Sequence, residues 1–170
     1  MSRLAEKPRF DPYELLGALE SRRVAYILIG AFARVIQGAD EVTEGIDIVP
    51  SMRDENINRL AHALDDLGAE RIDGKELDVS PESLVKEAVL ALQTERGELK
   101  VVPEPAGTRG YDDLRWHATG EHIGKGLRPR VASVNDLARM VAALGRENEL
   151  PQLLQLRRLA ELEVSRGIEL

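Results

Sequence analysis

A buried-strand pattern that runs directly into a tight turn is the feature that most constrains this chain. Val24–Ile29 is an uninterrupted apolar segment, and Gly30 and Ala31 follow it at once. A continuous apolar run of this length predicts a strand that is buried on both faces of a sheet. We expect a short helix at 31–37 next, because Gly38 is placed to end it. A second strand is expected at 45–50. The chain must therefore build a sheet whose first two strands are joined through a helix.

The remaining signals alternate between helix and strand. Serines 51, 80 and 133 are each placed to cap a helix. Interleaved helices and strands with a central hairpin predict an α+β (α/β mixed-sheet) fold with about four or five strands and a C-terminal helical pair. The other predicted elements are helices at 11–21, 51–67, a short one from 80, 133–145 and 151–167, a hairpin at 89–94 and 99–102, a loop with a helical turn at 108–116, and an edge strand at 128–132.

The length and the absence of cysteine limit the architecture. With 170 residues, the chain falls within the ~100–200 residues of one domain. We expect a single domain over 1–170, with its core at about 11–132 and the C-terminal helices at about 133–167. Because the chain has no cysteine, a disulfide scaffold, a thiolate metal site and a cysteine nucleophile are all excluded.

The charge balance limits the partners. Thirty acidic against twenty-three basic residues give a net charge of -7, which disfavours DNA and anionic membranes as partners. No stretch approaches the ~18 apolar residues of a membrane span, and the N-terminus lacks a signal-peptide apolar region, so we expect a cytoplasmic protein. Only five of the basic residues are lysines, which makes the position of each one informative.

The turn and the second strand together carry a resemblance. Gly30-Ala31, a short helix, Thr43 and then Asp47 on the next strand resemble the nucleotidyltransferase superfamily, which includes polymerase beta. The resemblance is closest to the minimal bacterial nucleotidyltransferases of toxin-antitoxin and abortive-infection systems. It covers roughly residues 11–160 and implies a nucleotidyltransferase-like fold. It also implies that Gly30, Ala31 and Thr43 belong to a nucleotide-binding site.

The sequence departs from the superfamily pattern at the metal site. Nucleotidyl transfer uses Mg²⁺ held by carboxylates, and two positions separated by one residue on a strand point to the same face. In the pattern Thr-x-Asp-Ile-Asp-Ile the first carboxylate position is Gly45 here, and only Asp47 remains. The third carboxylate, from a later strand, is replaced by Lys100. Asp47 is thus a remnant of the catalytic site, and we predict no metal site.

Lys100 suggests two roles. Its ammonium group would lie opposite Asp47, where it either pairs with that carboxylate or, helped by Arg34, contacts a nucleotide phosphate without metal. We therefore predict a pseudoenzyme that binds a nucleoside triphosphate or a protein partner in a bacterial toxin-antitoxin or abortive-infection context. The protein partner is a cognate small protein or a second copy bound through the C-terminal helices.

Two alternatives stay open. One is an active nucleotidyltransferase with rearranged ligands, in which Asp47 acts with Glu44 or Glu98 and Mg²⁺ to transfer a nucleotide to RNA or protein. The other is an interaction module that binds no small ligand.

Overall fold

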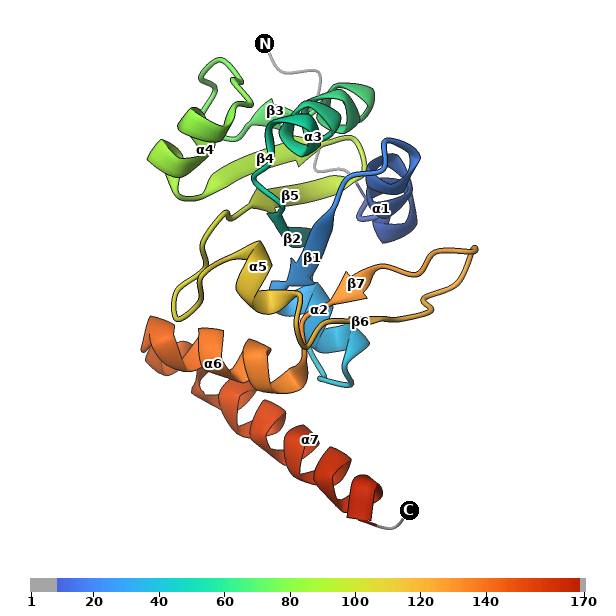
Figure 1. Ribbon diagram of the computed structural model, residues 1–170, viewed down its shortest axis with the longest axis vertical. Coiled ribbons are helices and arrows are strands. Elements are labelled where there is room, and N and C mark those ends of the chain that lie inside the picture. Colours follow the sequence, from blue (N-terminus) through green and yellow to red (C-terminus); the bar gives the residue numbers. More distant parts are fainter. Residues whose placement is uncertain (1–8, 169–170) are drawn as a thin grey trace.

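The fold is built on one seven-stranded mixed sheet with the order β3-β4-β5-β2-β1-β7-β6 (Figure 1). The computed structural model describes residues 9–168, with side chains described as far as residue 163. The elements are α1 (Pro12–Ser21), β1 (Tyr26–Ile29), α2 (Gly30–Ile36), β2 (Gly45–Pro50), α3 (Asp54–Asp66), β3 (Glu70–Arg71), α4 (Pro81–Glu87), β4 (Leu90–Thr94), β5 (Gly97–Val101), α5 (Tyr111–Leu114), β6 (Thr119–Gly120), β7 (Arg130–Val131), α6 (Val134–Leu144), a 3₁₀ helix (Glu147–Glu149) and α7 (Leu150–Ile168).

Strand β2 lies at the centre of the sheet and sets the register of the site. It pairs antiparallel with β1, where Ile29 opposes Asp47, and parallel with β5, where Lys100 opposes Asp47. Residues paired in this way point to the same face of the sheet. The register therefore places a carboxylate and an ammonium group side by side on adjacent strands.

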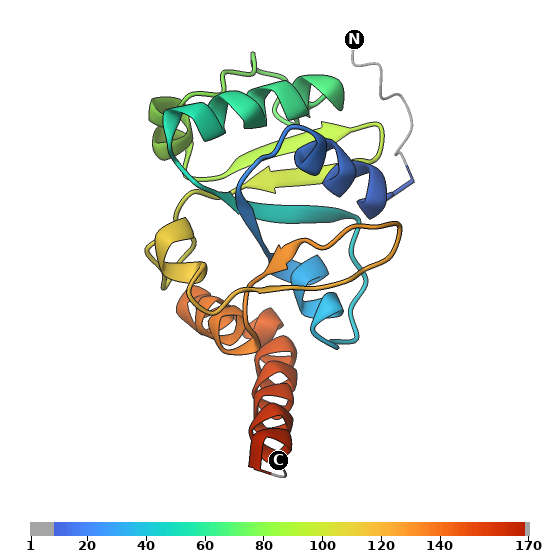
Figure 2. The ribbon, with the colours of Figure 1, turned by 45° about the vertical axis from the view of Figure 1, so that its right-hand side comes forward.

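Different helices cover the two faces of the sheet. On one face Ile46, Ile48 and Leu99 are fully buried, and α1, which contacts β2, packs against α3. On the other face α2 contacts β1 and β2, and α5 contacts β1 (Figure 2). Lys100 on β5 stays exposed. The face that carries Asp47 is thus covered over β1 and open over β5.

Helix capping agrees with the sequence at two of the three serines. Ser80 and Ser133 accept hydrogen bonds from the backbone N–H groups of Ser83 and Asp136. The predicted cap at Ser51 is wrong, because α3 begins at Asp54. The backbone groups of Ser51 form hydrogen bonds with other residues instead. Its N–H donates to the carbonyl of Ala25 at 3.0 Å, and its carbonyl accepts from Asn56 Nδ2 at 2.8 Å. Ser51 therefore continues the pairing of β1 with β2.

The mixed sheet is confirmed, but its strand count exceeds the prediction. The central hairpin is present as β4 and β5, joined by a turn at residues 95–96. Two strands of only two residues each, β3 and β6, were not predicted. The predicted edge strand is β7, which is not at the edge, because β6 folds back on it while β1 pairs with its other side.

The C-terminal helical pair is confirmed as α6 and α7. Helix α7 packs on α6 and then extends away from the sheet in both ribbon views (Figures 1 and 2). Within residues 9–168, no helix is both long and apolar enough to cross a membrane. The loop between α5 and β6 carries the only tryptophan of the chain, Trp116, with 76% of its surface exposed and the Arg115 guanidinium 5.7 Å from its ring centre.

Candidate functional site

A cleft of about 350 Å³ lies where the start of β2 meets β5 and the turn into α2. Four of the residues predicted for the site line it, and Gly30 is next to them in the chain. The lining residues are Ala31, Val42, Thr43, Glu44, Gly45, Ile46, Asp47, Glu98 and Lys100. The structure therefore brings together, in one concave surface, residues that lie up to 69 positions apart, from Ala31 to Lys100.

Asp47 lies directly against the turn at Gly30. The φ angle of Gly30 is +73°, and a Cβ built there would collide with the carboxylate of Asp47. Glycine is required at this position for two reasons, the left-handed backbone and the close approach of that carboxylate. The turn and Asp47 thus form one packed unit at the base of the cleft.

The protonation of Asp47 is set by opposing influences. Burial raises the pKa of Asp47 above its ordinary value, and the charge of Glu98 acts in the same direction. The positive charges of Lys100 and Arg34 lower this pKa but do not cancel the effect of burial. Within residues 9–163 the ion pairs do not include an Asp47–Lys100 contact, so Lys100 acts on Asp47 through space.

Arg34 and Thr43 are held by neighbouring groups of the protein. The Arg34 guanidinium donates two hydrogen bonds to Glu41, at 2.7 and 2.9 Å, and both side chains are nearly buried. The Thr43 hydroxyl donates to the carbonyl of Gly45 at 2.9 Å. Both contacts organise the segment between α2 and β2. Arg34 therefore contributes its charge near Asp47, while its Nε and Nη2 groups donate to Glu41.

At Gly45, where the resemblance implies a carboxylate, the structure leaves no room for a side chain. A Cβ at Gly45 would lie 2.5 Å from the carbonyl oxygen of Glu98 and 2.8 Å from its Cβ. Both distances are shorter than normal van der Waals contacts, and the first involves backbone. Strand β2 thus packs against β5 in a way that excludes the first metal ligand of the superfamily pattern.

The residues of the cleft do not fit the Mg²⁺ that the resemblance implies. Mg²⁺ requires several oxygen ligands in near-octahedral geometry, and a neighbouring cation opposes its binding. Among the described residues, no group of three or more acidic or histidine side chains is arranged to hold a metal ion. The lining of the cleft contains Asp47, Glu44 and Glu98 together with the exposed Lys100, and the three carboxylates do not form such a group.

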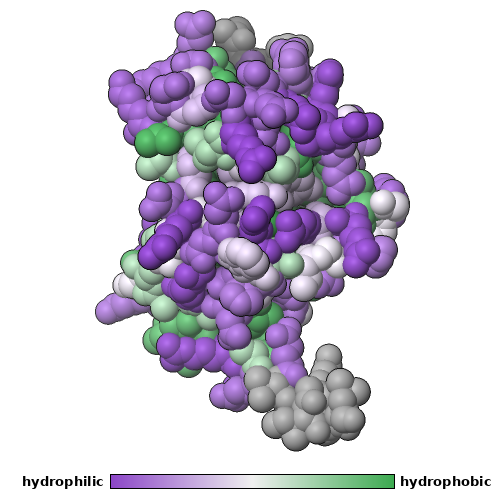
Figure 3. Space-filling model, in the orientation of Figure 1, coloured by the Kyte–Doolittle hydropathy of each residue, from purple (hydrophilic) through white to green (hydrophobic). Residues whose placement is uncertain are grey.

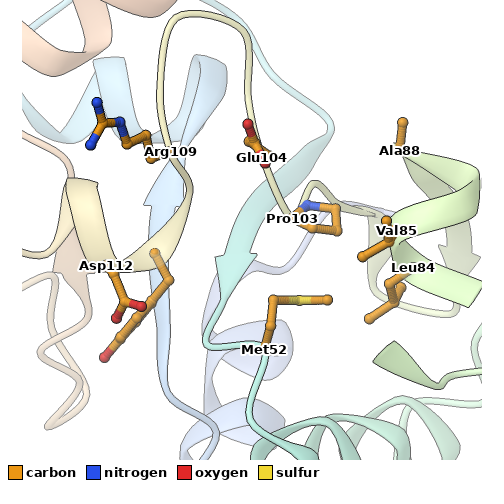
Figure 4. Close-up of a pocket in the computed structure, with 9 residues that line it drawn as sticks. Met52, Leu84, Val85, Ala88, Pro103, Glu104, Arg109 and Asp112 are labelled. Atoms are coloured by element: carbon orange, nitrogen blue, oxygen red, sulfur yellow. The ribbon is translucent and has the colours of Figure 1, made fainter. Parts of the chain in front are cut away.

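A second cavity, of about 240 Å³, lies at the other end of β2 and shares no residue with the cleft (Figure 4). The side chains of Met52, Leu84 and Val85 gather near Pro103 on one side of it, and Arg109 points away from them. It is a separate hollow between α4 and the loop that follows β5, and its lining is mixed, because Glu104, Arg109 and Asp112 join the apolar side chains.

Comparisons with known proteins give structural matches only. No protein-family model and no curated protein sequence matches the chain. The lincosamide antibiotic adenylyltransferase LnuA, solved with lincomycin bound, aligns over 89% of this chain and 99% of its own, with 17% identity and a TM-score of 0.60. The antibiotic-resistance factor ANT(2")-Ia, in complex with adenylyl-2"-tobramycin, aligns over 92% of this chain and 90% of its own, with 16% identity and a TM-score of 0.55. This chain has a nucleotidyltransferase fold.

A third solved structure also matches the nucleotidyltransferase fold. It is the nucleotidyltransferase candidate TM1012 of Thermotoga maritima, which aligns over 85% of this chain and 89% of its own, with 13% identity and a TM-score of 0.55. At these identities the likeness shows the shared fold, and the site has to be argued from its own residues.

Within the nucleotidyltransferase fold, sequence reasoning missed the role of Glu41. Its two hydrogen bonds to Arg34 cross the loop between α2 and β2, seven positions along the chain. No periodic pattern marks such a pair, because the loop has no regular spacing. The only available signal was the proximity of an arginine on a short helix to acidic residues in the following loop.

Proposed function

We propose that the protein binds a nucleoside triphosphate in the Asp47 cleft without metal and does not transfer it. The observation that carries this proposal is the register of Lys100 against Asp47 inside the cleft. A lysine at this position supplies to a phosphate the positive charge that a metal ion supplies in a metal-dependent transferase.

The state of Asp47 supports the same reading. A carboxyl group whose pKa is raised by burial is a poorer ligand for a cation than an ordinary ionised carboxylate. With no space for a side chain at Gly45, Asp47 has no second carboxylate two residues before it. The cleft volume of about 350 Å³ falls within the ~300–1,000 Å³ of small-molecule sites.

The first experiment measures nucleotide affinity without metal. Calorimetric titration with ATP, CTP, GTP and UTP in EDTA is expected to show binding of at least one of them. Lys100→Ala removes a charged hydrogen bond worth ~1.5–3 kcal/mol and weakens that binding by about 10- to 100-fold. Lys86→Ala is the matched control, since Lys86 is an exposed lysine on α4 outside the cleft.

Asp47→Asn separates this proposal from metal-dependent catalysis. In a metal-free phosphate site the carboxylate repels the ligand, so its removal tightens binding in EDTA by about fivefold, or ~1 kcal/mol. In a metal-dependent enzyme the same change removes a ligand and weakens both nucleotide binding and activity. Looser binding by Asp47→Asn in EDTA contradicts the proposal.

One alternative, an active transferase, has a specific observation in its favour. Glu44 and Glu98 line the same cleft as Asp47, so rearranged carboxylates are close to one another. The test is incubation with labelled nucleoside triphosphates and Mg²⁺ or Mn²⁺. The acceptors offered are total RNA, the protein itself, lincomycin and tobramycin. Incorporation that Asp47→Ala abolishes would establish the active enzyme and overturn the pseudoenzyme.

The setting that we propose is a bacterial toxin-antitoxin or abortive-infection system, with a cognate small protein as a candidate partner. This part rests on the sequence resemblance alone. An adjacent frame for a small antitoxin-like protein supports it, and a companion intact transferase favours a regulatory subunit instead. If none of the four nucleotides binds, the chain is an interaction module without a small ligand.

A further inference from the structure

Helix α7 has one buried side and one exposed side. Leu156 is fully buried and Leu159 is partly buried, and the Leu159 side chain reaches the turn at Gly38. Along its length α7 contacts α6 and the preceding 3₁₀ helix, and it extends away from the sheet (Figures 1 and 2). The opposite side of the helix therefore faces solvent.

The exposed side carries a line of four residues, which we call the α7 seam: Leu150, Leu154, Arg157 and Glu161. Their spacing of three and four residues places them along one stripe of the helix. Leu150 and Leu154 are 52% and 55% exposed. Figure 3 shows hydrophobic side chains at the surface near the junction of α6 and α7, where Leu144 is also exposed. A leucine pair at helical spacing on a projecting helix is typical of a helix-pairing surface.

Among the described side chains, the two charges of the seam have no ion-pair partner. Arg157 and Glu161 are exposed, and neither takes part in an ion pair among residues 9–163. They are four residues apart, but the arginine precedes the glutamate, which is the weaker order for a pair within one helix. Both charges are thus available to a second molecule.

We propose that the α7 seam binds the α7 seam of a second copy of this chain in antiparallel orientation. With a two-fold axis beside residue 159, Arg157 of each copy lies opposite Glu161 of the other, because each is two positions from the axis. The two contacts are identical, as an isologous interface requires. Reversal of one helix to a parallel arrangement would bring like charges together. Charged residues within an otherwise apolar seam specify orientation in this way.

In the same arrangement the helical backbone of the partner's α7 runs alongside Leu150 and Leu154, which lie at the start of α7. Helix α7 has 19 residues, so the contact is about 28 Å long. One helix pair of this length falls at or below the ~1,200 Å² lower end of stable interfaces. The dimer is therefore weak, with a Kd on the order of 10 μM or more.

Charge reversal tests the orientation directly. Sedimentation velocity of the full chain from ~1 to ~300 μM is expected to show a monomer–dimer equilibrium. Arg157→Glu and Glu161→Arg, made separately, each place like charges opposite one another and weaken the dimer by about tenfold or more. An equimolar mixture of these two variants restores both pairs and forms a mixed dimer. The double variant R157E/E161R restores them within its own homodimer.

The matched control is Glu163→Arg. It makes the same change of charge on the same helix, about 160° around the axis from Glu161, and is expected to leave the dimer unchanged. A second variant, Leu154→Gln, weakens the dimer without altering charge. Circular dichroism melting shows whether each variant is folded.

Three outcomes would overturn the proposal. One is a wild-type chain that stays monomeric at ~300 μM. Another is a dimer that is indifferent to the charge reversals. The third is a failure of the mixed variants to associate more strongly than either variant alone. None of these bears on nucleotide binding, which depends on Lys100 in a separate cleft.

Discussion

At the scale of the residue, Lys100 decides how the cleft responds to cations. Lys100→Asp places a carboxylate in register with Asp47 on the adjacent strand. Because two carboxylates on one face can hold a divalent ion, we expect a Mg²⁺-dependent rise in the Tm that the wild type lacks. For a Kd near 1 mM, 10 mM Mg²⁺ stabilises the fold by about 1.4 kcal/mol, which raises the Tm by roughly 3–6 °C.

The control for this prediction is Lys86→Asp, which makes the same change outside the cleft. Thermal melts of both variants at pH 8, with and without Mg²⁺, provide the measurement. No response in Lys100→Asp would mean that residues 47 and 100 do not converge as the strand register indicates.

A side chain introduced at Gly45 is expected to lower the stability of the protein. Adding Gly45→Asp to Lys100→Asp forces a Cβ to within 2.5 Å of the Glu98 carbonyl oxygen, so β2 and β5 must separate. Overpacking of this kind costs ~1–3 kcal/mol. Urea unfolding should show the double variant less stable than Lys100→Asp alone in the absence of metal. Equal stability would indicate that β5 yields easily at Glu98.

Asp47 makes the stability of the protein depend on pH. Its pKa is higher in the folded state than the ordinary value, so the native state binds the proton more tightly than the unfolded chain. The contribution of this group to stability is thus most favourable below its ordinary pKa and is lost as the pH rises through the raised folded pKa. Asp47→Asn should raise the Tm at pH 7 relative to wild type, and the gain should shrink towards pH 3. A gain that is independent of pH would contradict this assignment.

At the scale of the element, Asn56 joins α3 to the ends of β1 and β2. Its side chain is 5% exposed. Its Oδ1 accepts from Ala25 N–H at 2.7 Å, and its Nδ2 donates to the carbonyls of Ala25 and Ser51 at 2.9 and 2.8 Å. Asn56→Ala leaves three backbone groups without this partner and is expected to destabilise the fold by ~2–4 kcal/mol.

Chemical denaturation of Asn56→Ala and Asn58→Ala measures this effect. Asn58 lies on the same helix but is exposed, so its replacement is expected to change stability by less than ~0.5 kcal/mol. Equal losses in the two variants would show that the effect is one of helix propensity.

Elements with a local signal were predictable from the sequence. The bounds of β2 match the predicted 45–50, because turn residues on both sides of the apolar run mark where the strand begins and ends. Strands β3 and β6 have two residues each, too few for a period to appear. Ser51 carries a cap-like pattern, but pairing with Ala25 takes its backbone into the sheet. That contact joins distant parts of the chain and has no local signature.

The site was predictable to the same extent. Strand alternation and the resemblance placed Asp47 and Lys100 opposite one another, and the structure has them as register partners. The occupation of the Arg34 guanidinium by Glu41 depends on how a loop folds, and the closeness of Gly45 to Glu98 depends on the packing of two backbones. Neither is encoded in the spacing of residues along the chain.

At the scale of the whole molecule, self-association should appear as a stability that depends on concentration. Because the proposed dimer is formed by folded α7, the Tm of the wild type should rise between ~5 and ~300 μM protein. Arg157→Glu is expected to show a smaller rise in Tm over the same range. Differential scanning calorimetry is the measurement. A wild-type Tm that does not change with concentration would contradict association of the native state.

The net charge of -7 leads to a complementary expectation. We expect a molecule with this net charge to bind the dense phosphates of DNA poorly. The assignment of the whole chain to one domain stays a prediction.

The exposure of Trp116 has a practical consequence for following these molecules by spectroscopy. The only indole of the chain lies at the surface, beside Arg115 and outside the core. Its emission in the native protein should already resemble that of an indole in water, so unfolding shifts the fluorescence maximum very little. The same property makes it a sensitive reporter of anything that docks on the loop after α5, because shielding of a single fluorophore is read without background from the core.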